Sequence, residues 1–190
     1  MRALAAIVIG AALLVWPAFM NGYPLAFIDT VSYLLHTILG QHPWDKTAAY
    51  GPFLYAFHWR WTLWLPLAAQ GVLLSVLLWL VQRVATGLVT PLRHLALCVA
   101  LALLTTAPWF NATMMPDIFS GYTVLCLYLL GFGEKRLSRA EMAFAGVFGA
   151  IAIAVHLSHL PLAGGLVVLV LLLRRQWRPT LRAAARSPWQ

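Results

Sequence analysis

The sequence predicts an all-α, polytopic membrane protein, and three observations support this fold class. Hydrophobic residues make up 62% of the chain and charged residues 9%, whereas a soluble domain has roughly 45–50% and about 25%. The apolar residues gather in long runs that short polar segments separate. Most cations lie in the segments on one side of these runs, as the positive-inside rule requires. We therefore expect a single membrane domain, 1–190, with about six transmembrane helices.

The distribution of charge places both termini in the cytoplasm. Eleven of the thirteen Lys and Arg residues fall on one side of the expected membrane, and five of these lie in a basic tail at 174–190. Five of the six histidines and three of the five acidic residues fall on the other side, the outer side. The formal charge of +8 thus follows the positive-inside rule, and we expect no nucleic-acid partner. Chemistry that needs titratable side chains belongs at the outer side.

The expected spans follow the apolar runs in chain order. The first run, at 3–20, lacks a small-x-small cleavage site, so we expect an uncleaved span rather than a signal peptide. A long outer loop follows at 21–61. Further on, Pro108 and Pro116 divide the region 92–133 into two short spans. The expected spans are about 3–20, 62–82, 92–107, 117–132, 140–157 and 161–173.

The segment 140–173 admits two interpretations. As one tilted helix, it would leave the basic tail on the outer side, against the positive-inside rule. As two short spans, broken near His159 and Pro161, it brings the tail into the cytoplasm. We therefore expect two spans here.

Asp29 is the first candidate for function. It precedes a stretch at 30–39 whose pattern predicts an amphipathic helix on the outer surface. Asp29 suits the N-cap position of that helix, which is one role for it. Tyr33 and His36 lie four and seven residues after Asp29, so the three side chains share one helical face. Capping and catalysis therefore remain equal alternatives for Asp29.

Asp117 and two histidines are further candidates. Asp117 follows Pro116 at the expected start of a span, where an ionisable group is either a helix cap or a candidate base or metal ligand. His156 and His159 are three residues apart, so they can share a metal or hold a phosphate. The alternative is a hydrogen-bonded pair at a helix end. The sequence establishes no cofactor. A divalent cation bound by Asp117 and His159 is the candidate cofactor.

The outer loop also contains two cations, Lys46 and Arg60. Either one is a candidate for contacting a substrate phosphate. The loop also contains His42, Asp45 and His58, and most of its ionisable residues are expected to be solvated.

Four short motifs lie in or near these outer segments. They are Gly22-Tyr-Pro-x4-Asp-Thr-x-Ser-Tyr-Leu34, Tyr50-Gly-Pro-Phe-Leu-Tyr55, Ala107-Pro-Trp-Phe110 and Met115-Pro-Asp-Ile-Phe-Ser-Gly121. Together they resemble the GT-C superfamily of polyprenyl-phosphate-sugar-dependent membrane glycosyltransferases. The resemblance implies a bacterial inner-membrane enzyme that passes a sugar from a lipid carrier to an acceptor at the outer face. It also implies that Asp29 is the catalytic base and that Asp117 helps to bind a metal or the carrier phosphate.

These expectations define a hypothesis and an alternative. In the hypothesis, Asp29 and Asp117 are catalytic, and the partners are a lipid-linked sugar donor and membrane lipid. The alternative is a non-enzymatic membrane scaffold, or a transporter or flippase half, that requires a partner membrane protein. Short spans favour this alternative, because they suit the interior of a larger helix assembly. The expected substrate-binding residues are Tyr33, His36, Lys46, Arg60, His156 and His159.

Overall fold

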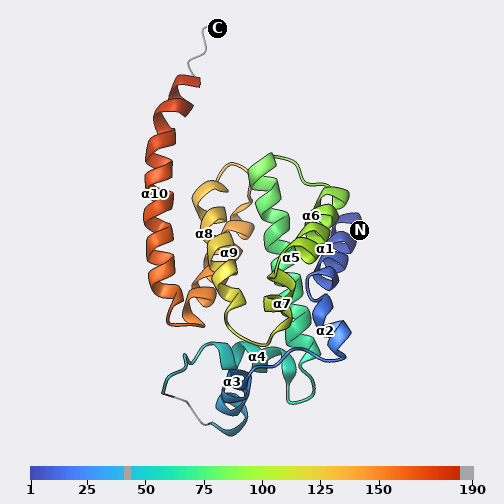
Figure 1. Ribbon diagram of the computed structural model, residues 1–190. Helices are drawn as coiled ribbons and strands as arrows, with labels where there is room; N and C mark the ends of the chain where they lie inside the picture. Colours follow the sequence, from blue (N-terminus) through green and yellow to red (C-terminus); the bar gives the residue numbers. More distant parts are fainter. Residues whose placement is uncertain (41–43, 185–190) are drawn as a thin grey trace.

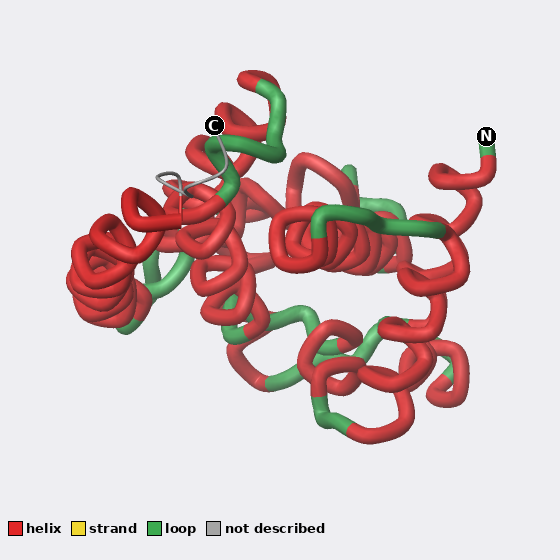
Figure 2. Tube along the Cα trace, turned by 90° about the horizontal axis from the view of Figure 1, so that it is seen from above, coloured by secondary structure: helices red, strands yellow, loops and turns green. Residues whose placement is uncertain are grey.

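The computed structural model describes residues 1–40 and 44–184, with side chains described as far as Arg175. His42 and the end of the basic tail lie outside the described residues. In the described part the regular structure is helical and contains no strand (Figure 2). The predicted all-α class is therefore confirmed. The helices are α1 (Arg2–Leu13), α2 (Trp16–Asn21), α3 (Ile28–Leu39), α4 (Tyr50–His58), α5 (Trp64–Thr86), α6 (Pro91–Leu104), α7 (Ala107–Ala112), α8 (Ile118–Phe132), α9 (Arg139–Ala154) and α10 (His159–Ala184).

The long helices run in alternating directions along the molecule (Figure 1). Helix α1 packs against α5 and α6, and α8 packs against α5, α9 and α10. The short helices α3 and α4 contact each other and lie across one end of the bundle, which we call the α3–α4 end. The N-terminus and the far end of α10 lie toward the opposite end (Figure 1).

Among the described helices, α5 alone is long and apolar enough to cross a membrane by length and composition. Four shorter apolar helices, α1, α3, α6 and α8, have 10–17 residues. A membrane-spanning element is thus supported at α5. The other expected crossings remain predictions.

The segment 140–173 forms two helices, because the chain turns between α9 and α10. Helix α9 ends at Ala154 and α10 begins at His159. Pro161 has no amide hydrogen to donate to the carbonyl of Leu157, which disfavours one continuous helix through this point. The break therefore lies just before His159, close to its predicted position.

The first apolar run, at 3–20, was expected to form one helix, but it forms two. Helix α1 ends at Leu13 and α2 begins at Trp16. Pro17 cannot supply an amide hydrogen for the carbonyl four residues earlier, which breaks the ladder of hydrogen bonds. At the same break, the carbonyl of Leu14 accepts a hydrogen bond of 3.1 Å from Nδ2 of Asn111, in α7.

Helix α7 also differs from expectation, since 107–112 was assigned to a loop. Proline is tolerated in a first helical turn, where its missing N–H has no partner in any case, and Pro108 occupies that turn. The segment after α7 then pairs with the chain before α3. The amide of Leu25 donates to Ala112 O at 3.0 Å, and the amide of Met114 donates to Leu25 O at 2.8 Å.

A buried polar network joins the α3–α4 end to the bundle. Gln70 and Asn111 are fully buried, and Tyr50 and Tyr122 are fully buried beside them. Tyr50 donates to Oε1 of Gln70 at 3.0 Å, and Nε2 of Gln70 donates to Asn111 O at 3.0 Å. The hydroxyl of Tyr122 lies 2.7 Å from Oδ1 of Asn111 and 3.0 Å from Gln70 O. Because buried polar groups are costly unless they are paired, the network fixes how α4, α5, α7 and α8 meet.

Candidate functional site

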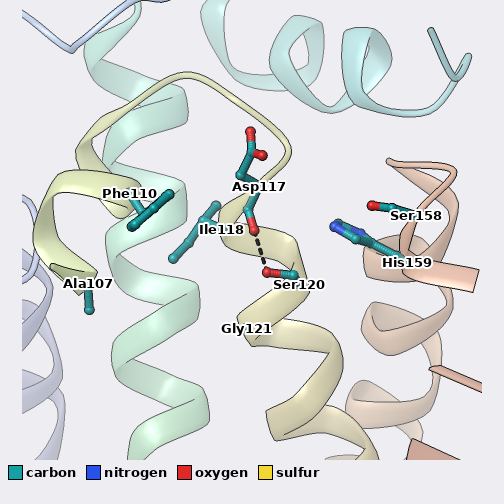
Figure 3. A pocket seen from close by; sticks show the side chains of 8 residues that line it. All are labelled: Ala107, Phe110, Asp117, Ile118, Ser120, Gly121, Ser158 and His159. Carbon is teal, nitrogen blue, oxygen red and sulfur yellow. Dashed lines mark hydrogen bonds between the residues drawn. The ribbon is translucent and has the colours of Figure 1, made fainter. Parts of the chain in front are cut away.

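Two hollows meet at Asp117, close to the α3–α4 end. The first is a cavity of about 360 Å³ whose lining includes Ser120, Ser158 and His159 (Figure 3). The second has about 320 Å³, and its lining is mainly apolar: Phe27, Trp109, Phe110 and Met115, with Thr113. Asp117 and Phe110 line both. A carboxylate therefore lies between a hollow with polar side chains and an aromatic one.

The side chain of Asp117 does not cap α8. Asp117 occupies the N-cap position, but no backbone amide donates to its carboxylate. Its main-chain oxygen accepts the hydroxyl of Ser120 at 2.7 Å and the amide of Ser120 at 3.1 Å. The residue is exposed, and its carboxylate points away from the axis of α8 (Figure 3). The interpretation of Asp117 as a cap is therefore wrong for its side chain, and the carboxylate is available to a ligand.

Asp29 is also not a cap. Helix α3 begins at Ile28, one residue before Asp29. The capping hydrogen bond comes from Thr30, whose Oγ1 accepts the amide of Phe27 at 2.9 Å. The same hydroxyl donates to Met114 O at 2.9 Å, which ties the start of α3 to the segment that leads to Asp117. Thr30 therefore provides the capping hydrogen bond that was expected from Asp29.

The carboxylate of Asp29 pairs with Lys46 instead. Nζ of Lys46 lies 2.8 Å from Oδ2 of Asp29 and 3.2 Å from Oδ2 of Asp45. The two hydrogen bonds to these carboxylates, that to Asp29 first, raise the pKa of Lys46, so the ammonium stays charged. The neighbouring Thr47 donates to Val155 O at 2.6 Å, which anchors this segment at the end of α9.

Tyr33 lies under these charges and is 2% exposed. Burial raises the pKa of the Tyr33 hydroxyl, and the charge of Lys46 opposes that rise, while Asp29 and Asp117 add to it. Tyr33 is therefore protonated at neutral pH and can donate a hydrogen bond. Of the predicted site residues in this region, Asp117 lines the two hollows, whereas Asp29, Tyr33 and Lys46 line neither of them.

The two histidines have different partners. Nδ1 of His159 lies 2.7 Å from Ala152 O, and a carbonyl only accepts, so Nδ1 carries the hydrogen and Nε2 of the neutral ring carries the lone pair. Nδ1 of His156 lies 2.7 Å from the hydroxyl of Ser158. The ring centroids are 5.3 Å apart. Both imidazoles are thus hydrogen-bonded at the helix ends, as the alternative interpretation expected, and the ring of His159 also faces the cavity (Figure 3).

His36 and Arg60 lie along α3 and α4. A methyl group built on Gly51 of α4 would lie 2.8 Å from Nδ1 of His36, so this ring packs against α4. The guanidinium of Arg60 donates to Ile38 O at 3.3 Å, near the last turn of α3. Neither residue lines the two hollows at Asp117. Their predicted role in substrate binding has no support from these hollows.

His58 is buried at 2% exposure, although most ionisable residues of its loop were expected to be solvated. Its Nδ1 accepts the amide of Arg60 at 2.8 Å. Burial, helped by the charge of Arg60, lowers the pKa of His58. Trp59 and Arg60 have φ values of 44° and 65°, so the chain makes a left-handed turn after His58, and this turn brings the amide of Arg60 to the His58 ring. His58 therefore belongs to the packing of α4.

The described residues contain no group of three or more His, Cys, Asp and Glu side chains that could hold a metal. Asp117 and His159 line the same cavity, which offers two ligands. The bond from His159 to Ala152 O leaves Nε2 as the free nitrogen, an arrangement common among metal-binding histidines. A carboxylate and an imidazole are ligands of a borderline cation such as Zn²⁺, whose remaining positions phosphate or water can fill. These residues therefore fit a cation that arrives with a phosphate.

Sequence reasoning missed several polar residues near the site. Gln70 stands inside an apolar run, and such an isolated amide is a signal of a buried polar contact. Ser158 was passed over between two histidines. Asn111 and Tyr122 carried no separate signal, because their bonds depend on how the helices meet.

Comparisons of the chain with protein-family models, with curated proteins and with solved structures give no match. The case for a function therefore rests on the residues and their geometry.

Proposed function

We propose that the chain is a polytopic membrane glycosyltransferase that passes a sugar from a polyprenyl-phosphate carrier to an acceptor at the outer face of a bacterial inner membrane. The observation that carries this proposal is the position of Asp117, which lines both the cavity with Ser158 and His159 and the aromatic hollow. A polyprenyl phosphate has a matching division between a charged head and an apolar chain. The α3–α4 end is then the outer end.

The surface of the α3–α4 end supports this placement. Amphipathic helices at an interface bury an apolar face in lipid, and aromatic residues concentrate at headgroup depth. Helix α3 exposes Ile28 and Val31. Exposed aromatic residues around this end include Tyr23, Phe27, Trp44, Tyr55, Phe57, Trp59, Trp61, Trp109 and Phe110.

The proposed reaction is an inverting transfer. The acceptor hydroxyl oxygen attacks the anomeric carbon, the bond from that carbon to the phosphate oxygen breaks, and the hydroxyl proton passes to Asp29. Polyprenyl phosphate is the leaving group. Lys46 holds Asp29 at 2.8 Å and supplies a positive charge beside it. Asp117 and His159 would hold a divalent cation, whose charge stabilises the departing phosphate.

The test compares two aspartates that contact the same lysine. Asp29→Asn removes the proposed base, whereas Asp45→Asn removes the other carboxylate on Lys46. Both variants are purified in detergent, checked for folding by gel filtration and thermal unfolding, and assayed for transfer of radiolabelled sugar from polyprenyl-phosphate donors. We expect Asp29→Asn to lose at least about 100-fold in rate, the size of a general-base contribution, and Asp45→Asn to keep most of the activity. Equal activity of Asp29→Asn and the wild type would exclude Asp29 as the base.

A second candidate function is a scaffold, or a transporter or flippase half, that binds a partner membrane protein. Helix α10 favours it, since Val167, Val168, Leu171 and Leu172 are exposed along one stretch of that helix. In this case Asp29→Asn and Asp117→Asn would change complex formation or stability and leave no chemical rate to measure. Purification under mild detergent, followed by native mass spectrometry, distinguishes an isolated chain from a stable complex.

A further inference from the structure

The proposed transfer gives no role to Ser158. Ser158 lines the cavity of about 360 Å³ beside His159 (Figure 3). It is exposed, and its Oγ lies 2.7 Å from Nδ1 of His156. A serine hydroxyl at this distance from an imidazole nitrogen is the contact that activates a nucleophile.

The direction of the shared hydrogen follows from a second contact. The main-chain amide of Ser158 also points at Nδ1 of His156, at 3.3 Å. An amide only donates, so Nδ1 carries a lone pair and no hydrogen. The hydroxyl of Ser158 must then be the donor in the 2.7 Å contact. His156 is therefore placed to receive the Ser158 proton.

Helix capping does not explain this serine. Ser158 directly precedes α10, where a serine side chain ordinarily accepts the amide of the third helical residue. That residue is Pro161, which has no amide hydrogen. The amide of Leu160, the second residue, lies 3.4 Å from Leu157 O. The usual capping partners of Ser158 are thus missing or engaged, and its hydroxyl turns to His156.

The same cavity contains a serine for comparison. Ser120 donates its hydroxyl to the main-chain oxygen of Asp117 at 2.7 Å. A carbonyl oxygen of this kind does not take up a proton at neutral pH, so Ser120 has no base. The cavity therefore holds one serine with a base and one without.

The cavity also adjoins a place for an apolar chain. Asp117 and Phe110 separate it from the hollow lined by Phe27, Trp109 and Met115. A lipid ester could place its carbonyl group at Ser158 and its acyl chain along these aromatic side chains. This geometry selects an amphipathic ester over a small polar one.

We propose that Ser158 is a nucleophile, activated by His156, that accepts an acyl group from a lipid carboxylic ester. Oγ of Ser158 attacks the ester carbonyl carbon and its proton passes to Nδ1 of His156. The bond from that carbon to the alcohol oxygen breaks, and the alcohol leaves with the proton from His156. Water then attacks the acyl carbon and gives one proton to His156. The bond from that carbon to Oγ of Ser158 breaks, the carboxylic acid leaves, and His156 returns the proton to Ser158.

The test uses a long-chain alkyl fluorophosphonate on the full chain in detergent. Oγ of Ser158 forms a bond to phosphorus, the bond from phosphorus to fluorine breaks, and fluoride leaves. Peptide mass spectrometry locates the adduct. We expect the wild type to be labelled at Ser158, and Ser158→Ala to be unlabelled. Ser120→Ala is the matched control, and it should be labelled at the wild-type rate. His156→Gln should slow labelling by about 100-fold or more, the size of a general-base effect.

Pro161→Ala separates a reactive serine from a purely structural one. This variant restores an amide at the third position of α10, which can draw the Ser158 hydroxyl into a capping bond. We expect slower labelling of Ser158 together with an unchanged or higher unfolding temperature. An unlabelled, folded wild type would overturn the proposal, and so would labelling of Ser158 at the same rate in His156→Gln. Neither result bears on sugar transfer, because the readout is the adduct.

Discussion

Nζ of Lys46 lies 2.8 Å from Oδ2 of Asp29, although the two residues belong to different segments of the α3–α4 end. Both side chains are partly buried, at 16% and 35% exposure. This ion pair, together with the bond from Thr47 to Val155 O, attaches the segment before α4 to α3 and to the end of α9. The candidate base is thus held by a cation that can also meet a phosphate.

Replacing Lys46 separates the effect of this pair on folding from its effect on activity. A partly exposed ion pair contributes about 1 kcal/mol or less, so Lys46→Met should fold and lose only a few degrees in unfolding temperature. Sugar transfer should fall much further, because Asp29 loses its positioning contact and the phosphate loses a cation. Thermal unfolding and the transfer assay, run on one preparation, check both expectations. A loss of activity no larger than the loss of folded protein would contradict this role for Lys46.

Gln70 is expected to be the most sensitive position of the buried network. Gln70→Leu leaves the hydroxyl of Tyr50 and the carbonyl of Asn111 without their partner. Each unsatisfied buried group costs about 1–3 kcal/mol. Combining Gln70→Leu with Tyr50→Phe removes one orphaned hydroxyl, so the double variant should lose less than the sum of the single variants. Unfolding in mixed micelles measures this coupling, and strictly additive losses would contradict the network.

Gly10 is expected to control how closely α1 approaches α5 and α6. A Cβ at this position would lie 2.8 Å from Oγ of Ser75 and 2.9 Å from both Sγ of Cys98 and Nε2 of His94. Gly10→Ala should therefore destabilise the fold by about 1–3 kcal/mol through overpacking. Gly164→Ala is the matched control, since nothing lies within 4 Å of a Cβ there. Equal unfolding temperatures for the two variants would show that α1 can move aside.

His58 should make the stability depend on pH. Burial lowers the pKa of the folded-state imidazole below its ordinary value of 6.5, so protonation favours the unfolded chain. Stability is therefore full above the unfolded-state pKa of about 6.5 and is lost as the pH falls through the folded-state pKa. His58→Gln, which keeps an acceptor for the amide of Arg60, should flatten the profile between pH 8 and pH 5. If the stability of His58→Gln changed with pH in the same way as that of the wild type, the pH dependence would come from another group.

The sequence was most informative where periodicity and proline act locally. The amphipathic helix after Asp29 was predicted at 30–39 and observed at Ile28–Leu39. The break between α9 and α10 follows from Pro161. The same reasoning missed the break at Pro17, because the uniform apolar run around it suggested one span. It also missed α4 and α7, which are short helices inside regions assigned to loops.

The candidate site was predictable as a set of residues and not as a geometry. Asp29 and Asp117 were selected from their positions, but each was also compatible with capping. The answer for Asp29 came from Thr30, whose hydroxyl bonds to Met114 far along the chain, and the answer for Asp117 came from Ser120, which bonds to its main-chain oxygen. His36 and Arg60 share the outer loop with the site residues, yet they face other contacts. Sequence separation gives no measure of such distances, because packing of the short helices decides them.

The most direct test of the account is binding of polyprenyl phosphate to the purified chain with Zn²⁺, a cation that both a carboxylate and an imidazole bind. We expect saturable binding by the wild type, loss of binding on chelation of the cation, and at least about tenfold weaker binding by Asp117→Asn and by His159→Ala. The control is Glu134→Gln, which should bind as the wild type does. Glu134 is an exposed carboxylate on the α8–α9 loop, and it pairs with Arg174 of α10. A folded wild type that binds no polyprenyl phosphate, or an Asp117→Asn variant that binds it equally well, would contradict the account.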